Sequence, residues 1–254
     1  MGRVLMIASQ KGGVGKTTTA VNLSASLAAA EKRTLLVDID PQANACSGMG
    51  IDKMAQEFTI YHALLGETAV QDILVHTDLK HLDLLPANTD LIGAEIELVS
   101  ALARETRLAG VLKEIRHEYE YILIDCPPSL GLLTVNALTA ADAVLIPLQC
   151  EFYAMEGLSQ LMNTVGLIQK ELNPRLTLQG ILLTMFDGRN NLSHQVGDEI
   201  RQHFDGKVFK SVIPRNVRLS EAPSYGMPAL LYDISSRGAA AYLELAKEII
   251  ETGK

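Results

Sequence analysis

Two lysines enclose a glycine-rich segment near the start of the chain, in the run Lys11-Gly12-Gly13-Val14-Gly15-Lys16-Thr17-Thr18-Thr19. Glycines allow consecutive backbone N–H groups to curl around an anion, and the start of a helix adds the positive end of its dipole. In a phosphate-binding loop of this type, Lys16 reaches the β- and γ-phosphates of a nucleotide and the Thr17 hydroxyl ligates Mg²⁺. The segment therefore predicts a nucleotide site, and a glycine-rich turn with incidental lysines is the alternative.

The first lysine is the unusual feature of this loop. The strict pattern, G-x-x-x-x-G-K-[ST], places glycine where this chain has Gln10, so the loop is a variant of that pattern. Lys11 comes too early in the loop to cradle the phosphates of its own site. Its charge must therefore point elsewhere or serve a second γ-phosphate, unless Lys11 is an ordinary solvated lysine.

Carboxylates follow two apolar runs that are typical of buried strands. The first run ends in Asp38-Ile39-Asp40 and the second ends in Asp125. If strand geometry persists, Asp38 and Asp40 lie on the same side and both can face the nucleotide, although a turn or helix-cap role is the alternative for either. Asp125 has the place of a Walker B aspartate, which holds Mg²⁺ through a water molecule. A lone strand-end aspartate is weak evidence, so this prediction depends on its combination with the loop.

Apolar, β-branched runs alternate with helical stretches along the chain. They predict strands at residues 4–8, 34–37, 82–85, 121–124, 143–148 and 178–184. The remaining stretches predict helices at residues 17–30, 90–102, 108–117, 135–140, 156–171, 193–204 and 236–252. Strands separated by helices form a parallel sheet covered on both faces. We therefore expect an α/β fold of the doubly wound P-loop NTPase type, with its ligand beyond the carboxyl ends of the strands.

Length and composition limit the organisation of the chain. Its 254 residues contain no linker, repeat or low-complexity tract, so we expect one domain spanning residues 1–254. No stretch approaches the roughly 18 consecutive apolar residues of a membrane span, and the N-terminus lacks a signal-peptide layout, so we expect a cytoplasmic protein. The formal net charge of −8 argues against a generally basic nucleic-acid-binding surface and restricts any such contact to a local patch.

The three cysteines, Cys46, Cys126 and Cys150, are odd in number and widely spaced. They form no C-x-x-C pair, so their spacing favours reduced structural thiols over disulfides or a zinc site. An iron–sulfur ligand shared across a dimer is the alternative.

The last expected helix bears on membrane binding. Its predicted buried face carries Ala240, Leu243, Ala246, Ile249 and Ile250, and its other positions are rich in glutamate. A membrane-surface helix needs a basic polar face and large apolar anchors, so this helix is predicted to pack against the core.

Together the motifs resemble those of the ParA/MinD class of P-loop ATPases, whose deviant phosphate-binding loop carries an early lysine. The runs that begin at Asp125 (DCPPSLGLLTVNAL) and at Ile213 (IPRNVRLSEAPSYG) are similar to those of the chromosomal ParA/Soj partition proteins, and the likeness extends nearly end to end. The resemblance implies that Lys11 crosses a dimer interface to the partner's nucleotide. It also implies that Asp40 orients the attacking water and that Asp38 lies near Mg²⁺.

A lysine that acts across an interface gives Gly12 a steric role, because any side chain there would crowd the facing subunit. Family members commonly have glycine at the position of Ala43. That departure costs little unless the backbone there needs a positive φ.

The resemblance also implies roles for loop residues in the second half of the chain. Pro214 and Asn216 are expected near the adenine, with Met185 beside the ring, where proline and methionine offer apolar faces and asparagine a donor and an acceptor. Arg189 and Arg218 are expected to hold DNA without sequence preference. Ordinary loop structure and solvated or paired arginines are the alternatives.

The resemblance implies an ATPase that hydrolyses ATP to ADP and phosphate with Mg²⁺, with Lys11, Lys16 and Asp40 as catalytic residues. Hydrolysis is expected to depend on homodimer formation, and the ATP-bound dimer is expected to bind nonspecific double-stranded DNA on the nucleoid and to work with a ParB-type partner. No membrane partner is expected. A MinD-like, membrane-associated division-site ATPase and an iron–sulfur-cluster carrier ATPase are the alternatives.

Overall fold

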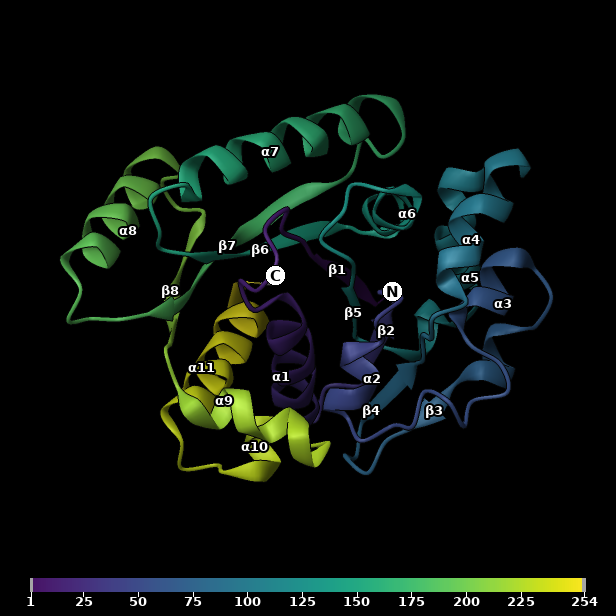
Figure 1. Cartoon of the computed structure of the whole chain (residues 1–254), viewed down its shortest axis with the longest axis horizontal. Coiled ribbons are helices and arrows are strands. Elements are labelled where there is room, and N and C mark those ends of the chain that lie inside the picture. Colours follow the sequence, from purple (N-terminus) through teal and green to yellow (C-terminus); the bar gives the residue numbers. More distant parts are fainter. Residues whose placement is uncertain (1, 253–254) are drawn as a thin grey trace.

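The computed structural model describes residues 2–252, and an eight-stranded sheet runs through them (Figure 1). The strand order is β3-β4-β2-β5-β1-β6-β7-β8. The strands are β1 (Arg3–Ile7), β2 (Thr34–Asp38), β3 (Val75–His76), β4 (Leu82–Leu85), β5 (Tyr121–Asp125), β6 (Ala143–Gln149), β7 (Thr177–Phe186) and β8 (Val208–Pro214). Within the described residues, neighbouring strands are parallel except β3 and β4. The mostly parallel sheet is as predicted.

Eleven α-helices lie in the described part of the chain. They are α1 (Lys16–Ala29), α2 (Asn44–Gly48), α3 (Ile60–Leu65), α4 (Leu91–Glu97), α5 (Arg107–Ile115), α6 (Leu132–Ala140), α7 (Ala154–Glu171), α8 (Asn191–His203), α9 (Val217–Glu221), α10 (Ala229–Tyr232) and α11 (Arg237–Thr252). Figure 1 shows α1 and α11 on one face of the sheet and α6 and α7 on the other. The fold is therefore the doubly wound α/β arrangement that the alternating pattern predicts.

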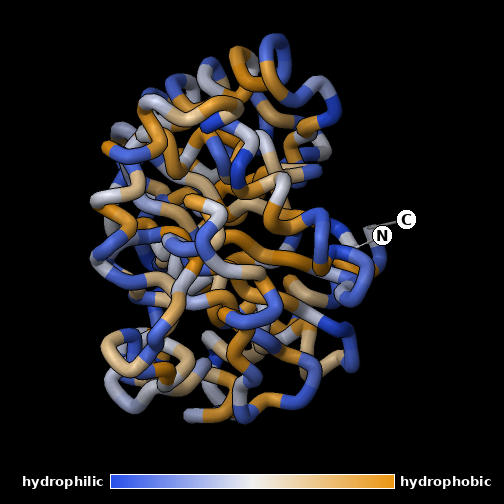
Figure 2. Tube along the Cα trace, turned by 90° about the vertical axis from the view of Figure 1, so that its right-hand side faces the viewer, coloured by the Kyte–Doolittle hydropathy of each residue, from blue (hydrophilic) through white to orange (hydrophobic). Residues whose placement is uncertain are grey.

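The central strands are buried on both faces. Every residue of β2 and of β5 is buried, which is why these strands appear in the sequence as unbroken apolar runs. Figure 2 shows hydrophobic segments passing through the middle of the molecule and hydrophilic segments at many of its outer turns. The edge strand β8 is only partly buried, and its polar Lys210 and Ser211 interrupt the apolar pattern, which explains why the sequence did not predict it.

The predicted helix at residues 90–102 is broken. The α-helix α4 ends at Glu97, a 3₁₀ turn covers Leu98–Ser100, and Ala101 is extended. The side chain of Arg104 donates to the Val99 carbonyl oxygen at 2.7 Å, and so takes an acceptor that a continuing helix would use for its own backbone. The prediction of one long helix was wrong for that reason.

Helix α11 packs against β8 and α1, as predicted, but through a rotated face. Ala240 is exposed and Leu243 is half-buried, whereas the buried positions are Gly238, Ala239, Tyr242, Leu245, Ala246 and Ile249. The Tyr242 hydroxyl lies 3.1 Å from the Thr19 hydroxyl. The tyrosine turns toward α1 because this hydrogen bond satisfies its polar end inside the core.

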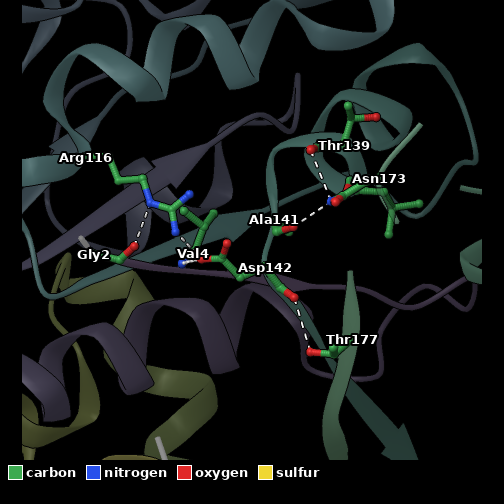
Figure 3. Close-up of polar contacts among 9 residues, drawn as sticks. Gly2, Val4, Arg116, Thr139, Ala141, Asp142, Asn173 and Thr177 are labelled. Carbon is green, nitrogen blue, oxygen red and sulfur yellow. Dashed lines mark hydrogen bonds and ion pairs between the residues drawn. The ribbon is translucent and has the colours of Figure 1, made fainter. Parts of the chain in front are cut away.

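A polar network fixes the start of β1 at the amino-terminal edge of the sheet (Figure 3). Arg116 donates to the Gly2 carbonyl oxygen at 2.7 Å and forms an ion pair with Asp142. The same carboxylate accepts from the Val4 backbone N–H at 2.8 Å. These contacts hold the start of β1 beside the start of β6. The glycine-rich loop that follows β1 at the opposite edge of the sheet is therefore attached to a strand in a fixed position.

Candidate nucleotide-binding site

The glycine-rich loop joins β1 to α1 at the carboxyl edge of the sheet. Gly13 and Gly15 have φ values of +73° and +89°, in the left-handed region that favours glycine. Gly15 is the N-cap of α1, a helix of 14 residues, so the positive end of a helix dipole lies at the loop. Lys16, the first residue of that helix, is buried. This geometry suits a phosphate-binding loop, as predicted.

The loop is held from the side by a residue that sequence reasoning did not select. The Thr184 hydroxyl of β7 donates to the Val14 carbonyl oxygen at 2.8 Å. Both residues are buried. A threonine inside an apolar strand carries no signal of this contact, because its partner is 170 residues away in the sequence.

Lys11 and Gly12 lie on the outer side of the loop. The Lys11 ammonium forms an ion pair with the Glu151 carboxylate in the connection between β6 and α7, and the two side chains are 54% and 44% exposed. A Cβ atom placed on Gly12 would meet nothing within 4 Å in this chain. The fold of a single chain therefore gives no steric reason for glycine at this position.

The two predicted metal-binding carboxylates lie side by side. Asp38 ends β2 and Asp125 ends β5, and they are register partners on adjacent strands with fully buried side chains. The oxygens of Asp38 accept from the backbone N–H groups of Asp40 at 3.1 Å and Cys46 at 3.0 Å. Burial raises the pKa of Asp38 to about 6, in spite of these hydrogen bonds.

Asp125 is the least satisfied of these groups. Neither carboxylate oxygen has a hydrogen-bond partner among the described residues. Burial, followed by the nearby charge of Asp38, raises the pKa of Asp125 well above its usual range, while the Thr17 hydroxyl and the Lys16 ammonium act in the opposite direction. A buried carboxylate with two unpaired oxygens and a second carboxylate beside it is an environment that a cation would stabilise.

The residues fit Mg²⁺. Carboxylate and hydroxyl oxygens are ligands that this ion prefers, and Asp125, Asp38 and Thr17 supply them at one place. Within residues 2–252, no group of three or more His, Cys, Asp and Glu side chains is placed to hold a metal.

Asp40 lies beside this pair and is buried. One of its oxygens accepts from the Gln42 backbone N–H at 2.9 Å, so the turn role that the sequence left open is present. The other carboxylate oxygen of Asp40 accepts no hydrogen bond from the described residues, so it can contact water. The predicted role in orienting a water molecule therefore stays a prediction.

A cavity of about 580 Å³ opens next to the loop. Its lining brings together five residues that the sequence analysis assigned to the nucleotide, namely Gly15, Thr18, Met185, Pro214 and Asn216. They come from α1, the ends of β7 and β8, and the start of α9. This size and mixed lining are typical of a small-molecule site.

The backbone at two of these positions is specialised. Met185 has a φ of +48°, an unusual value for a residue with a side chain. Asn216 is the N-cap of α9, where its side-chain oxygen accepts from the Arg218 N–H at 3.1 Å. The cap uses one of the two lone pairs of the Asn216 oxygen, so the amide NH₂ group and the second lone pair are left for the edge of a base.

The two predicted DNA contacts are both paired with carboxylates of the same chain. Arg189 lines the cavity and binds Asp187 through two hydrogen bonds of 3.0 Å, which lower the pKa of Asp187 to about 2. Arg218 pairs with Glu221 at 2.7 Å and with Asp233 at 3.2 Å. DNA phosphates would have to compete with these carboxylates, and both DNA contacts stay predictions.

Ala43 has a φ of +51°, so its replacement of the usual glycine carries a conformational cost of about 1 kcal/mol.

Cys46, Cys126 and Cys150 are free and buried, and burial raises the pKa of each thiol. Buried thiols are poorly placed to share a cluster with a second chain.

No helix within residues 2–252 has both the length and the apolar character needed to cross a bilayer.

These features define a P-loop nucleotide-binding protein: a mostly parallel sheet, a glycine-rich loop after a central strand, a buried lysine and aspartates at strand ends. A family model described as an AAA domain matches residues 2–178. The chromosome partitioning protein ParA of Myxococcus xanthus is 58% identical over 251 residues, which cover 99% of this chain and 89% of that protein. The sporulation initiation inhibitor protein Soj of Bacillus subtilis is 58% identical over 253 residues, which cover all of both chains.

Among solved structures, a cobyrinic acid a,c-diamide synthase from Mycobacterium smegmatis with bound ADP and magnesium has a TM-score of 0.87 and 38% identity, and the match covers 100% of this chain and 97% of that one. Its ligands agree with the expected cofactors, ATP and Mg²⁺. The chain belongs to the ParA/Soj family of chromosome-partitioning ATPases. The family predicted from the motifs is thus confirmed.

Proposed function

We propose that this protein is a Mg²⁺-dependent ATPase whose hydrolysis is coupled to homodimer formation. The observation that carries the proposal is the position of Lys11, which lies on the outer side of the phosphate loop with an exposed side chain, beside a glycine with open space around it. A lysine placed in this way can serve the nucleotide of a facing copy, whereas the buried Lys16 serves its own.

The groups around the nucleotide cavity have separable tasks in the proposed reaction. Lys16 and the backbone N–H groups of the loop bind the β- and γ-phosphates, and Asp40 orients the water that attacks the γ-phosphorus. Mg²⁺, when bound by Asp125, Asp38 and Thr17, neutralises negative charge on the phosphates. Lys11 of the second copy stabilises charge on the γ-phosphoryl group in the manner of an arginine finger. Phosphate and ADP are the products.

We further propose that the ATP-bound dimer holds nonspecific DNA through Arg189 and Arg218 and that hydrolysis releases it. Phosphate contacts explain binding without sequence preference. A dimer presents the patch twice, which partly offsets the net charge of −8. A ParB-type partner would accelerate hydrolysis and so set the time spent on the nucleoid.

The test is retention on unrelated double-stranded DNA sequences with and without ATP, repeated as salt is raised. We expect binding that requires ATP, ignores sequence and falls steeply with salt. The Lys16→Ala variant, which lacks the phosphate-binding lysine, is the control and should not bind. Binding that is absent in the wild type, or that is equally strong without ATP, would overturn the proposal.

A further inference from the structure

Strand β7 is irregular at its carboxyl end, beside the nucleotide cavity. Its pairing with β8 shifts register between Leu183 and Phe186, and Met185, which lies between them, has a φ of +48°. Successive side chains of a regular strand point to opposite faces of the sheet. Thr184 and Met185 nevertheless both line the cavity. An irregularity of this kind redirects side chains and is over-represented next to active sites, so these two residues form one support for a ligand.

Thr184 is the residue of this support that contacts the glycine-rich loop. It is buried, and its hydroxyl donates to the Val14 carbonyl oxygen at 2.8 Å. Among the described residues, this is the only hydrogen bond that the Val14 carbonyl oxygen accepts. Val14 is itself buried, so its carbonyl oxygen would have no partner if the hydroxyl were removed.

The contact fixes the direction of the peptide bond between Val14 and Gly15. No cis peptide bond occurs within residues 2–252, so the C=O and the N–H of this peptide point in opposite directions. Because Thr184 holds the carbonyl oxygen, the Gly15 N–H points away from β7. This N–H donates to no carbonyl group of the described residues, and so it is available to a phosphate oxygen at the start of α1.

A flip of the same peptide would reverse its polarity toward the ligand. Gly15 has no Cβ atom and so offers little resistance to rotation of the peptide before it. After a flip, the Val14 carbonyl oxygen would take the place of the N–H group and would repel phosphate oxygens. The Thr184 hydroxyl opposes this rotation because it binds only the unflipped carbonyl.

We infer that Thr184 is a positioning residue of the nucleotide site, whose hydroxyl directs the Gly15 N–H toward the phosphates. The inference rests on the proposed function, because it requires the loop to bind a nucleotide. Thr184 acts through the Val14–Gly15 peptide and not on the reacting atoms. With Met185 as the next residue, one strand end supports both the phosphate loop and the expected place of the base.

The experiment measures the affinity of the full-length chain for ADP with Mg²⁺ by calorimetry. Thr184→Val removes the hydroxyl and keeps the branched shape, whereas Thr184→Ser keeps the hydroxyl. Thr34→Val is the matched control, because Thr34 is also buried and its hydroxyl donates to the Lys32 carbonyl oxygen at 2.8 Å. Thr34 begins β2 and therefore lies at the opposite edge of the sheet from the loop.

We expect Thr184→Val to weaken ADP binding by about tenfold or more, and Thr184→Ser and Thr34→Val to stay within about threefold of the wild type. The amide proton resonance of Gly15 reports the peptide directly. In the wild type and in Thr34→Val it should move downfield when ADP binds, because a hydrogen bond to a charged oxygen deshields the proton. In Thr184→Val this movement should be largely lost.

ADP affinity of Thr184→Val close to that of the wild type would overturn the inference and leave the proposed function intact. An equal loss in Thr34→Val would reveal general destabilisation, and an equal loss in Thr184→Ser would show that the methyl group matters instead of the hydroxyl. Either result also overturns the inference. If Thr184→Val does not fold, a wild-type Gly15 resonance that ADP leaves unmoved overturns it. A wild type that does not bind ADP would refute the proposed function and the inference together.

Discussion

The Lys11 ammonium and the Glu151 carboxylate form an ion pair between the glycine-rich loop and the connection that precedes α7, although the two residues are 140 positions apart in the sequence. About half of each side chain is exposed. Exposed ion pairs contribute up to about 1 kcal/mol. The ion pair therefore holds Lys11 beside Glu151 in the single chain, and breaking it requires little free energy.

Replacing the carboxylate should release Lys11. We expect Glu151→Gln to strengthen ATP-dependent dimerisation by up to about fivefold, because the lysine no longer has to leave an ion pair. Glu156→Gln in the first turn of α7 is the matched control, since Glu156 is acidic and makes no ion pair within the described residues. Equal dimerisation of Glu151→Gln, Glu156→Gln and the wild type would show that the pair has no influence.

The two lysines of the loop should separate binding from hydrolysis. Lys11→Ala should keep nucleotide affinity but lose hydrolysis by about a hundredfold or more, as is typical when a cation supplied across an interface is removed. Lys16→Ala should lose nucleotide binding itself. Fluorescent-nucleotide titration and phosphate release measure the two properties. Normal hydrolysis in Lys11→Ala would end the argument that this lysine acts across a dimer.

The buried carboxylates predict opposite pH effects on the metal-free and metal-bound protein. Burial raises the pKa of Asp38 above its ordinary value to about 6, so the folded state binds an extra proton between the two values. The metal-free protein should therefore lose stability, on the order of 3 kcal/mol, as pH rises through this window. Mg²⁺ requires ionised carboxylates, so its affinity should rise over the same window.

Thermal unfolding from pH 4 to pH 8, with and without Mg²⁺ and an ATP analogue, measures both effects. Asp125→Asn serves as the control, because it removes one charge of the pair and should remove most of the stabilisation by Mg²⁺. Equal pH profiles with and without the metal would contradict the assignment of this pair to Mg²⁺.

Replacement of Met185, which has a positive φ and lines the cavity, should affect nucleotide affinity more than the stability of the fold. Met185→Gly removes an unfavourable positive φ but adds freedom to the unfolded chain, so the free energy of unfolding should change by less than about 1 kcal/mol. Nucleotide affinity should fall several-fold, because the apolar face beside the ring is lost. Calorimetry of ATP-analogue binding checks this, and unchanged affinity would place the base elsewhere.

The salt dependence of DNA binding tests the arginines. Arg189→Ala should weaken binding to all sequences equally and reduce the slope of log affinity against log salt by about 1 per subunit. Arg201→Ala is the control, because Arg201 also pairs with a carboxylate, that of Asp198, but was not predicted to meet DNA. If both variants reduce the slope equally, Arg189 has no special contact.

Local sequence patterns predicted six of the eight strands in their order along the chain, all but β3 and β8, together with the chemistry of the loop. Glycines followed by Lys16 and Thr17 define a phosphate site because the backbone requirement and the ligands are local to one strand–loop–helix segment. The strand-end positions of Asp38 and Asp125 had the same local basis. The place of Asp38 near Mg²⁺, and so near Asp125, was implied by the family resemblance.

The distant residues that complete the site became apparent from the packing of the elements in the folded chain. Glu151 beside Lys11 and Thr184 beside Val14 are contacts across long sequence separations, which no periodicity encodes. The positive φ at Ala43 follows from the turn in which the chain is held.

Contacts with other residues also explain two differences from the predicted helices. The hydrogen bond from Arg104 to the Val99 carbonyl oxygen accompanies the break after α4, and the buried Tyr242 accompanies the rotated face of α11. Local spacing sets which element forms and which groups it carries. Packing and hydrogen bonding between elements decide where each element ends and which side chains contact one another. These interactions join residues that are far apart in the chain, so a local pattern does not predict them.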